Sequence, residues 1–221
     1  MLQTTHELKE AGTKVLVAPT TKMFIREAER VGSVLTAEDR DELRSKAVQV
    51  LTREEAVVAG SSLLSRERVG GVEPDWVPFL APEDGVTLVE ADGSRRRPLK
   101  GMAAHEPLLP EGATLVVVMG GVRALGQPVD EEHVHRPGVF SELTGVGPDH
   151  TIDAEAFARA LLAGLRNVPD GARRAALLAD VDPGWTMTRA SAVARTLWHG
   201  GVRKVVLSSL PKETPGQVWT L

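Results

Sequence analysis

Residues 86–93 read Val-Thr-Leu-Val-Glu-Ala-Asp-Gly: a run suited to a buried strand, then two carboxylates, Glu90 and Asp92, and Gly93. Apolar residues on consecutive positions are typical of a strand covered on both faces, as parallel strands in α/β sheets are. Polar residues at the carboxyl end of such a strand lie at the edge where ligands bind in open α/β sheets. The stretch therefore predicts an α/β fold with its working edge at residues 90–93.

Short apolar runs of this kind alternate with helical patterns along the chain, in the manner of stacked βα units. We predict six strands, at residues 14–18, 56–60, 86–90, 114–119, 174–178 and 204–207, and a candidate edge strand at 217–220. Helices are expected over residues 2–11 and after Thr36, Asp153 and Thr188, where start signals precede apolar residues at helical spacing. Two Gly- and Pro-rich stretches, 70–82 and 120–148, are predicted to be long functional loops.

These elements predict one α/β domain over residues 1–221, with three layers and a mostly parallel sheet flanked by helices. The absence of cysteine excludes disulfides, thiolate nucleophiles and cysteine metal sites. A formal net charge of -4 argues against nucleic acid or an anionic membrane as a partner. No apolar run approaches the roughly 20 residues that cross a bilayer, and the N-terminus has no signal-peptide core. We therefore expect a cytoplasmic protein.

Glu90 and Asp92 are the predicted catalytic and metal-binding carboxylates, because one or two carboxylates typically hold Mg²⁺ beside phosphate ligands. The basic run that follows them, Arg95 to Arg97 and Lys100, suits a phosphate or carboxylate ligand. An ordinary solvated charged turn is the alternative interpretation of this segment.

The strand at residues 14–18 is followed by Thr20, Thr21 and Lys22, whose hydroxyl and ammonium groups suit contact with phosphate or with metal-bound water. A helix cap followed by an exposed lysine is the alternative. Because ligands bind at the carboxyl ends of parallel strands, we expect Thr20–Lys22, the two carboxylates and the basic run to converge on one anion and magnesium site at this edge of the sheet. In GTPase-like folds, an Asn-Lys-x-Asp after a later strand binds guanine through its last carboxylate. Here Asp182 occupies that place without the Asn and Lys, so a preference for guanine is unsupported.

Two histidine-containing loop segments, His105-Glu106-Pro107 and His133-Val134-His135, follow the strands at 86–90 and 114–119. If these loops meet, His105, Glu106 and His135 are candidates for acid/base chemistry or metal binding, since neutral imidazole is a common ligand and proton carrier. Surface positions or loop-closing hydrogen bonds are the alternative.

Taken in order, these motifs resemble the selenium-dependent hydroxylase accessory proteins called YqeC, which look like P-loop NTPases. The resemblance is carried by Thr20-Thr21-Lys22-Met23, Glu90-Ala91-Asp92-Gly93, Arg97-Pro98-Leu99-Lys100, His105-Glu106-Pro107, Gly120-Gly121-Val122 and His135-Arg136-Pro137. It implies a nucleotide-dependent factor in the maturation of molybdenum hydroxylases, with ATP or GTP and Mg²⁺ as cofactors. A molybdenum hydroxylase or a molybdopterin-processing enzyme is the implied partner.

The resemblance also implies roles for individual residues. By analogy with P-loop enzymes, Asp92 would act on Mg²⁺ with Glu90 beside it, and His105 is the third catalytic candidate. The implied nucleotide-binding residues are Thr20, Thr21, Lys22, Gly93, Arg97, Lys100 and Asp182.

The chain departs from the family in one respect, because no Gly-x-x-x-x-Gly-Lys-Ser/Thr phosphate loop occurs in it. Relative to the family it opens inside the helix that should follow that loop, so the first strand and the Walker A loop are lacking. We therefore expect no nucleotide hydrolysis. Two alternatives stay open: a non-catalytic interaction module for the same enzymes, and a metal-dependent transferase or hydrolase that uses His105, Glu106 and His135.

Overall fold

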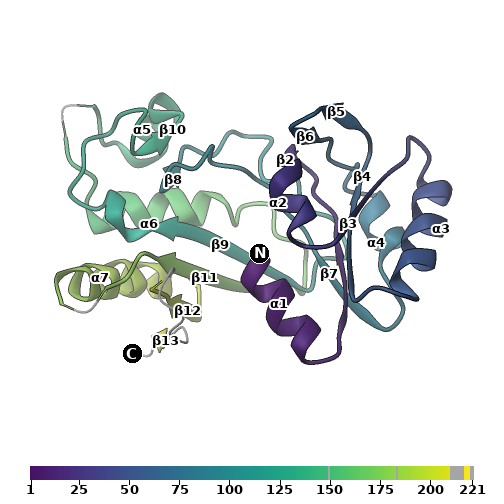
Figure 1. Ribbon diagram of the computed structural model, residues 1–221. Helices are drawn as coiled ribbons and strands as arrows, with labels where there is room; N and C mark the ends of the chain where they lie inside the picture. Colours follow the sequence, from purple (N-terminus) through teal and green to yellow (C-terminus); the bar gives the residue numbers. More distant parts are fainter. Residues whose placement is uncertain (149, 183, 210–216, 220–221) are drawn as a thin grey trace. The chain divides into compact units, whose positions relative to one another are not determined.

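The computed structural model describes residues 1–148, 150–182, 184–209 and 217–219, which form two compact units (Figure 1). Unit 1 comprises Met1–Gly93 and Leu108–Gly112, and unit 2 comprises Ser94–Pro107 and Ala113–Leu221. Both units contain a mostly parallel sheet flanked by helices, which confirms the predicted α/β class. That residues 1–221 fold as one domain stays a prediction.

The main sheet of unit 1 has four parallel strands in the order β3 (Ser33–Thr36), β4 (Ala56–Gly60), β1 (Lys14–Val17) and β7 (Gly85–Leu88). The strands predicted at 14–18, 56–60 and 86–90 are confirmed, although β7 ends two residues before Glu90. The short strand β3 was not predicted. A small antiparallel sheet joins β2 (Met23–Phe24), β6 (Arg68–Val69) and β5 (Leu63–Ser65).

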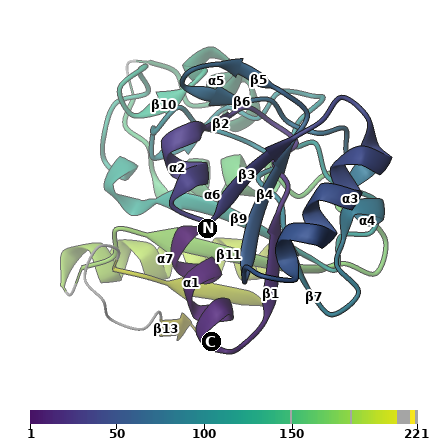
Figure 2. The same ribbon diagram turned by 45° about the vertical axis from the view of Figure 1, so that its right-hand side comes forward.

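Helices cover both faces of the main sheet in unit 1. Leu16 and Val57 pack on one face with residues of α3 (Arg40–Leu51) and α4 (Trp76–Leu80). Val15 and Val17 pack on the other face with residues of α1 (Leu2–Glu10) and α2 (Ile25–Glu29) (Figure 2). Successive residues of β1 therefore enter opposite layers, as the alternation of a strand requires, and unit 1 has three layers.

The main sheet of unit 2 has the order β13 (Gln217–Trp219), β12 (Lys204–Leu207), β11 (Arg173–Ala179) and β9 (Leu115–Gly121). Strands β9, β11 and β12 are parallel, whereas β13 is an antiparallel edge strand, so all four predictions for this region are confirmed. Helices α6 (Ala154–Ala163) and α7 (Trp185–His199) pack against each other and against β9 and β12. The α6 helix begins where expected, because the Asp153 carboxylate accepts a hydrogen bond from Ala156 N at 2.7 Å.

The structure differs from the predictions in two respects. The predicted strands are distributed over two four-stranded sheets instead of one. The stretches predicted as long loops contain α4, the 3₁₀ turn η1 (Val122–Ala124), β10 (Val134–His135) and α5 (Pro137–Thr144), and β10 pairs with β8 (Leu99–Lys100). Among the described residues, no helix combines the length and the apolar character that a membrane span requires.

Candidate functional site

In unit 1, the segments that follow β1 and β7 lie side by side, as expected for the carboxyl ends of neighbouring parallel strands. Thr20 N donates a hydrogen bond to the Glu90 carbonyl at 3.0 Å, and Thr20 Oγ1 donates to the Leu108 carbonyl at 2.7 Å. Thr20 is buried, whereas Lys22 is exposed. We call the group of Thr20, Thr21, Glu90 and Asp92 the carboxyl corner.

The backbone of residues 71–72 fixes the loop at Thr20 and Thr21. A Cβ atom on Gly71 would lie 2.6 Å from the Thr20 carbonyl carbon and 2.7 Å from Thr21 N, so only glycine fits here without a shift. Val72 N donates a hydrogen bond to the Pro19 carbonyl at 2.8 Å. Sequence reasoning did not single out Gly71, because this close approach joins segments about 50 positions apart, where local patterns give no signal.

Electrostatics distinguish Glu90 from an ordinary surface carboxylate. Burial raises the pKa of Glu90 to about 7, the carboxylates of Glu27 and Asp92 add to the rise, and the Met1 amino group and Arg68 oppose it. A carboxyl group that titrates near neutral pH can hold or release a proton under physiological conditions.

In the described part of the chain, no three His, Asp or Glu residues are grouped so that they alone could hold a metal ion. The predicted magnesium site consists of Glu90 and Asp92 beside phosphate ligands, and it stays a prediction. Glu90 would also have to lose its proton before it could bind a cation. We therefore derive no chemical step through Mg²⁺ at the carboxyl corner.

In unit 2, the basic run begins with a strained turn. Arg97 N donates to the Ser94 carbonyl at 3.1 Å, and Ser94 Oγ donates to the Arg97 carbonyl at 2.7 Å. Between them, Arg95 and Arg96 have φ angles of 52° and 65°, a conformation that favours Asn or Gly. A non-glycine residue there costs roughly 1–2 kcal/mol. Strain of this kind points to a role for the side chains it displays.

The basic run then enters β8, which lies beside β10, so that Lys100 is paired in register with His135. The Lys100 side chain is only 6% exposed and its Nζ lies 3.0 Å from Glu106 Oε2. The same carboxylate oxygen accepts hydrogen bonds from Arg136 Nη1 and from Ala103 N, the latter at 3.2 Å. Burial raises the pKa of Glu106, but the hydrogen bonds from Arg136 and Lys100 outweigh it and lower the pKa to about 2.

The pKa of His135 shows that positive charge prevails around β8 and β10. Burial lowers the pKa of His135, and the cations of Arg136, Lys100, Arg95 and Arg97 lower it further. The imidazole is therefore neutral at pH 7 and can donate or accept a hydrogen bond. We call these four cations together with His135 the cationic cluster.

Within the cationic cluster, the carboxylate of Glu106 binds Lys100 and Arg136 directly, and the charges of all four cations act on His135. The excess of positive charge disfavours a metal cation at His135 and favours an anion. Arg136 has a φ of 62°, so a third arginine of this region occupies the left-handed conformation.

Two more of the predicted residues, His105 and Asp182, are exposed. His105 is exposed in the turn that precedes Glu106. Asp182 is exposed after β11. Its backbone N donates a hydrogen bond to the Thr186 hydroxyl at 2.7 Å, and its carboxylate accepts one from Ser209 Oγ at 3.2 Å. The basic run belongs to unit 2 and the carboxyl corner to unit 1, so the predicted convergence of all three segments stays a prediction.

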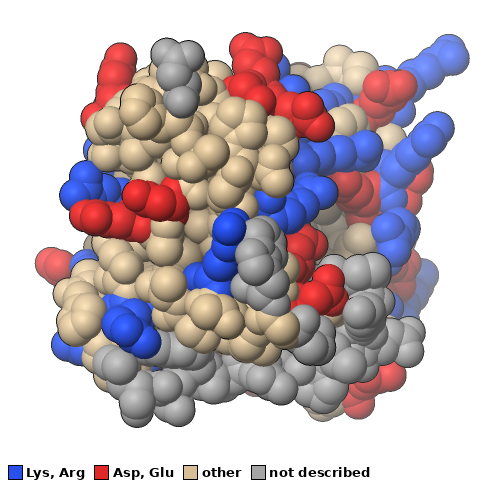
Figure 3. Space-filling model, turned by 90° about the vertical axis from the view of Figure 1, so that its left-hand side faces the viewer, with Lys and Arg blue, Asp and Glu red and all other residues tan. Residues whose placement is uncertain are grey.

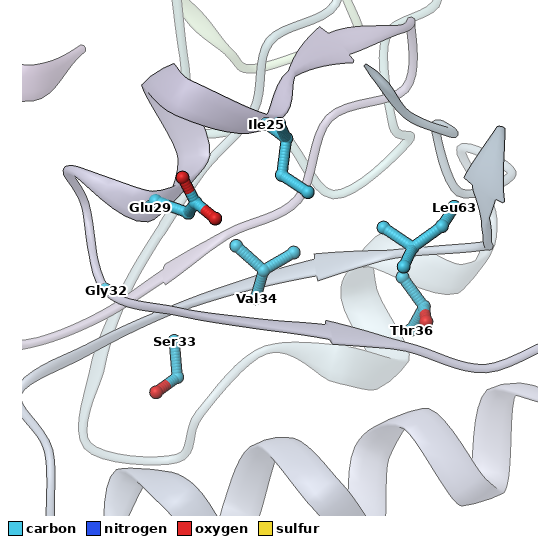
Figure 4. Close-up of a pocket in the computed structure, with 7 residues that line it drawn as sticks. All are labelled: Ile25, Glu29, Gly32, Ser33, Val34, Thr36 and Leu63. Carbon is cyan, nitrogen blue, oxygen red and sulfur yellow. The ribbon is translucent and has the colours of Figure 1, made fainter. Parts of the chain in front are cut away.

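On the face drawn in Figure 3, Lys and Arg side chains are interspersed with Asp and Glu side chains. A hollow of about 480 Å³ in unit 1 contains none of the predicted site residues (Figure 4). It is lined by Ile25, Glu29, Gly32, Ser33, Val34, Thr36 and Leu63.

Comparison with known proteins identifies relatives of this chain. The family described as YqeC protein matches residues 1–138. The chain is 34% identical over 184 residues to the protein named "Uncharacterized protein YqeC" from Escherichia coli (strain K12), an alignment that covers 76% of this chain and 65% of that protein. The chain thus spans about two thirds of the length of this relative. No solved structure matches the chain.

Proposed function

The chain belongs to the YqeC family, and from this premise we propose that it binds a phosphate-bearing ligand, a nucleotide such as ATP or GTP, through the cationic cluster of unit 2. The observation that carries the proposal is the pairing of Lys100 with His135 in the sheet, together with the positive charges of Arg95, Arg97 and Arg136 that act on the same imidazole. Arginine suits phosphate because its planar guanidinium donates paired hydrogen bonds to two oxygens.

The architecture of the cluster supports a preorganised anion site. Arg97 Nε donates to the Glu131 carbonyl at 2.8 Å and Arg97 Nη1 donates to the Arg95 carbonyl at 2.9 Å, so its side chain is already oriented. Ordering a side chain before the ligand arrives lowers the entropic cost of binding. Glu106 neutralises part of the charge and holds Lys100 and Arg136 in place.

The wider role that we propose is that of an accessory factor in the maturation of a molybdenum hydroxylase that carries a labile selenium. This role is what the resemblance of the sequence motifs implies. The corresponding partner is a molybdenum hydroxylase or a molybdopterin-processing enzyme, and the corresponding activity is ligand binding without hydrolysis.

Isothermal titration calorimetry tests the binding proposal. ATP, GTP and pyrophosphate are titrated into the full chain with MgCl₂ and again with EDTA, at two salt concentrations. An Arg95→Gly variant removes one cation and also relieves the φ strain, so it should fold while it weakens binding. The matched control is Arg195→Ala, which removes an exposed arginine of α7 in the same unit.

We expect binding that weakens at higher salt and that Arg95→Gly reduces about tenfold, equivalent to about 1.4 kcal/mol. The control should bind like the unmodified chain. Absence of binding to all three anions, or equal affinities for Arg95→Gly and the unmodified chain, would refute the proposal.

A phosphate-release assay tests the expectation that the chain does not hydrolyse nucleotides. Purified chain incubated with Mg-ATP or Mg-GTP should release no phosphate above the buffer blank. Steady release that Asp92→Ala abolishes would show that the carboxyl corner is catalytic.

A further inference from the structure

Among the described residues, the sheet of unit 2 has one face that helices cover and an opposite face that carries exposed apolar side chains. On the covered face, Val118 and Gly120 of β9 lie against α6: a Cβ atom on Gly120 would lie 2.8 Å from Phe157 Cζ. Val118, Ala176 and Val205, from three different strands, are all buried. On the open face, Leu115, Val117 and Met119 of β9 are 45%, 45% and 54% exposed.

Strand register shows that the open face continues across three strands. Leu115, Val117 and Met119 pair with Arg173, Ala175 and Leu177 of β11, and the last two pair with Lys204 and Val206 of β12. Paired residues of a parallel sheet share a face. A hollow of about 600 Å³ lies over this surface and is lined by residues of β9, β11 and β12. We call this surface of β9, β11 and β12 the open face.

Two kinds of side chain divide the open face. Its apolar part runs along β9 and the carboxyl-terminal halves of β11 and β12, through Met119, Leu177 and Val206. Its cations, Arg173 and Lys204, are the first residues of β11 and β12 and lie at the opposite end. Sheets of parallel strands are normally covered on both faces. An exposed apolar strip of this kind therefore indicates a binding surface for an apolar partner.

We propose that the open face binds an amphipathic α-helix of a partner protein, with an apolar stripe over β9 and β11 and with carboxylates in its last turn against Arg173 and Lys204. The charge pattern of the open face fixes this choice. A helix that covers parallel strands runs opposite to them, and its carbonyl end then lies at the strand starts. That end carries partial negative charge, which the two cations complement.

The open face is independent of the cationic cluster, because none of the cluster residues lines the hollow over it. Failure of nucleotide binding would therefore leave this inference intact, and the reverse holds as well.

Fluorescence anisotropy with synthetic peptides tests the proposal on the full chain. The first peptide is an amphipathic helix with a leucine stripe, glutamates in its last turn and a free carboxyl terminus. The second has the same stripe, lysines in its last turn and an amidated terminus. We expect the acidic-ended peptide to bind about tenfold more tightly than the basic-ended one, with a difference that shrinks at high salt.

Variants assign the binding to the open face. Val117→Asp should abolish binding of the acidic-ended peptide. The matched control is Val48→Asp, because Val48 is an apolar residue of α3 that is 54% exposed and lies in the other unit. The exposed pair Arg173→Glu and Lys204→Glu should fold like the unmodified chain and should reverse the order of the two peptides.

Three outcomes would overturn the proposal. Equal affinities for the two peptides would remove the role of the cations, and binding that survives Val117→Asp would place the peptide elsewhere. A concentration-dependent dimer in light scattering that Val117→Asp abolishes would assign the open face to a second copy of this chain.

Discussion

Replacement of Glu106 by glutamine removes the carboxylate that Lys100 and Arg136 share. The drop of the Glu106 pKa from near 4.5 to about 2 corresponds to about 3 kcal/mol, which solvent screening reduces to about 2 kcal/mol. The Lys100 side chain is 6% exposed, and breaking a buried ion pair by removing one partner costs about 3–5 kcal/mol. We therefore expect Glu106→Gln to lower the free energy of unfolding at pH 7 by about 2–4 kcal/mol.

This effect depends on pH in a defined direction. Because the folded-state pKa lies below the unfolded value, the stabilisation is present above about pH 4.5 and is lost as the pH falls toward 2. Urea unfolding followed by circular dichroism at pH 7 and at pH 3 measures both the loss and its decrease at low pH.

The matched control is Glu155→Gln on α6, where Glu155 pairs with Arg159 and both side chains are more than half exposed. Such a pair contributes under about 1 kcal/mol. If Glu106→Gln cost no more than Glu155→Gln, or if its cost were the same at both pH values, the assigned electrostatics of the cationic cluster would be wrong.

Three further predictions concern other parts of the structure. Because the pKa of Glu90 is raised, the free energy of unfolding should fall by up to about 3 kcal/mol as the pH rises from about 4.5 through 7. Urea titrations across this range should show the fall in the unmodified chain and not in Glu90→Gln. Parallel pH curves for the two proteins would contradict the raised pKa. Gly71→Ala should lower the free energy of unfolding by about 1–3 kcal/mol, whereas Gly93→Ala should lower it much less, because there is open space around Gly93. Equal unfolding midpoints for the two variants would argue against the close approach of Gly71 to the backbone of Thr20 and Thr21. Asp39→Ala should lower the free energy of unfolding by about 1 kcal/mol, because the Asp39 carboxylate caps α3 by accepting a hydrogen bond from Glu42 N. An unchanged Tm would contradict this capping role.

The sequence predicted the strands of the fold well, because their apolar runs are local signals. It did not predict which strands pair, since register arises from contacts between distant segments. Strand β3 was missed because Ser33–Thr36 is short and only half-buried. Helix α5 carries readable signals, with Pro137 in its first turn and Gly145 at φ 77° after its end, but the surrounding Gly and Pro residues outweighed them.

The candidate sites follow the same division. Thr20 and Glu90 were predicted together because the carboxyl ends of parallel strands share an edge, and the structure confirms that they meet. The ion pair of Glu106 with Arg136 joins residues 30 positions apart, so no local pattern predicts it. The left-handed turn at Arg95 contains no Gly or Asn that would indicate it in the sequence. Sequence therefore identified the basic run as an anion-binding candidate, whereas its geometry required the fold.

Glu90 and Glu106 show how two residues of one type acquire opposite chemistry from their surroundings. Glu106 is ionised, but Lys100 and Arg136 already neutralise it, so a phosphate that approaches Arg95 and Arg97 meets little repulsion from it. Glu90 has neighbouring carboxylates, so an anion gains nothing at the carboxyl corner unless a proton or a cation accompanies it. Binding at the cationic cluster should consequently be as tight with EDTA as with MgCl₂, whereas a ligand held by Glu90 and Asp92 would require the metal.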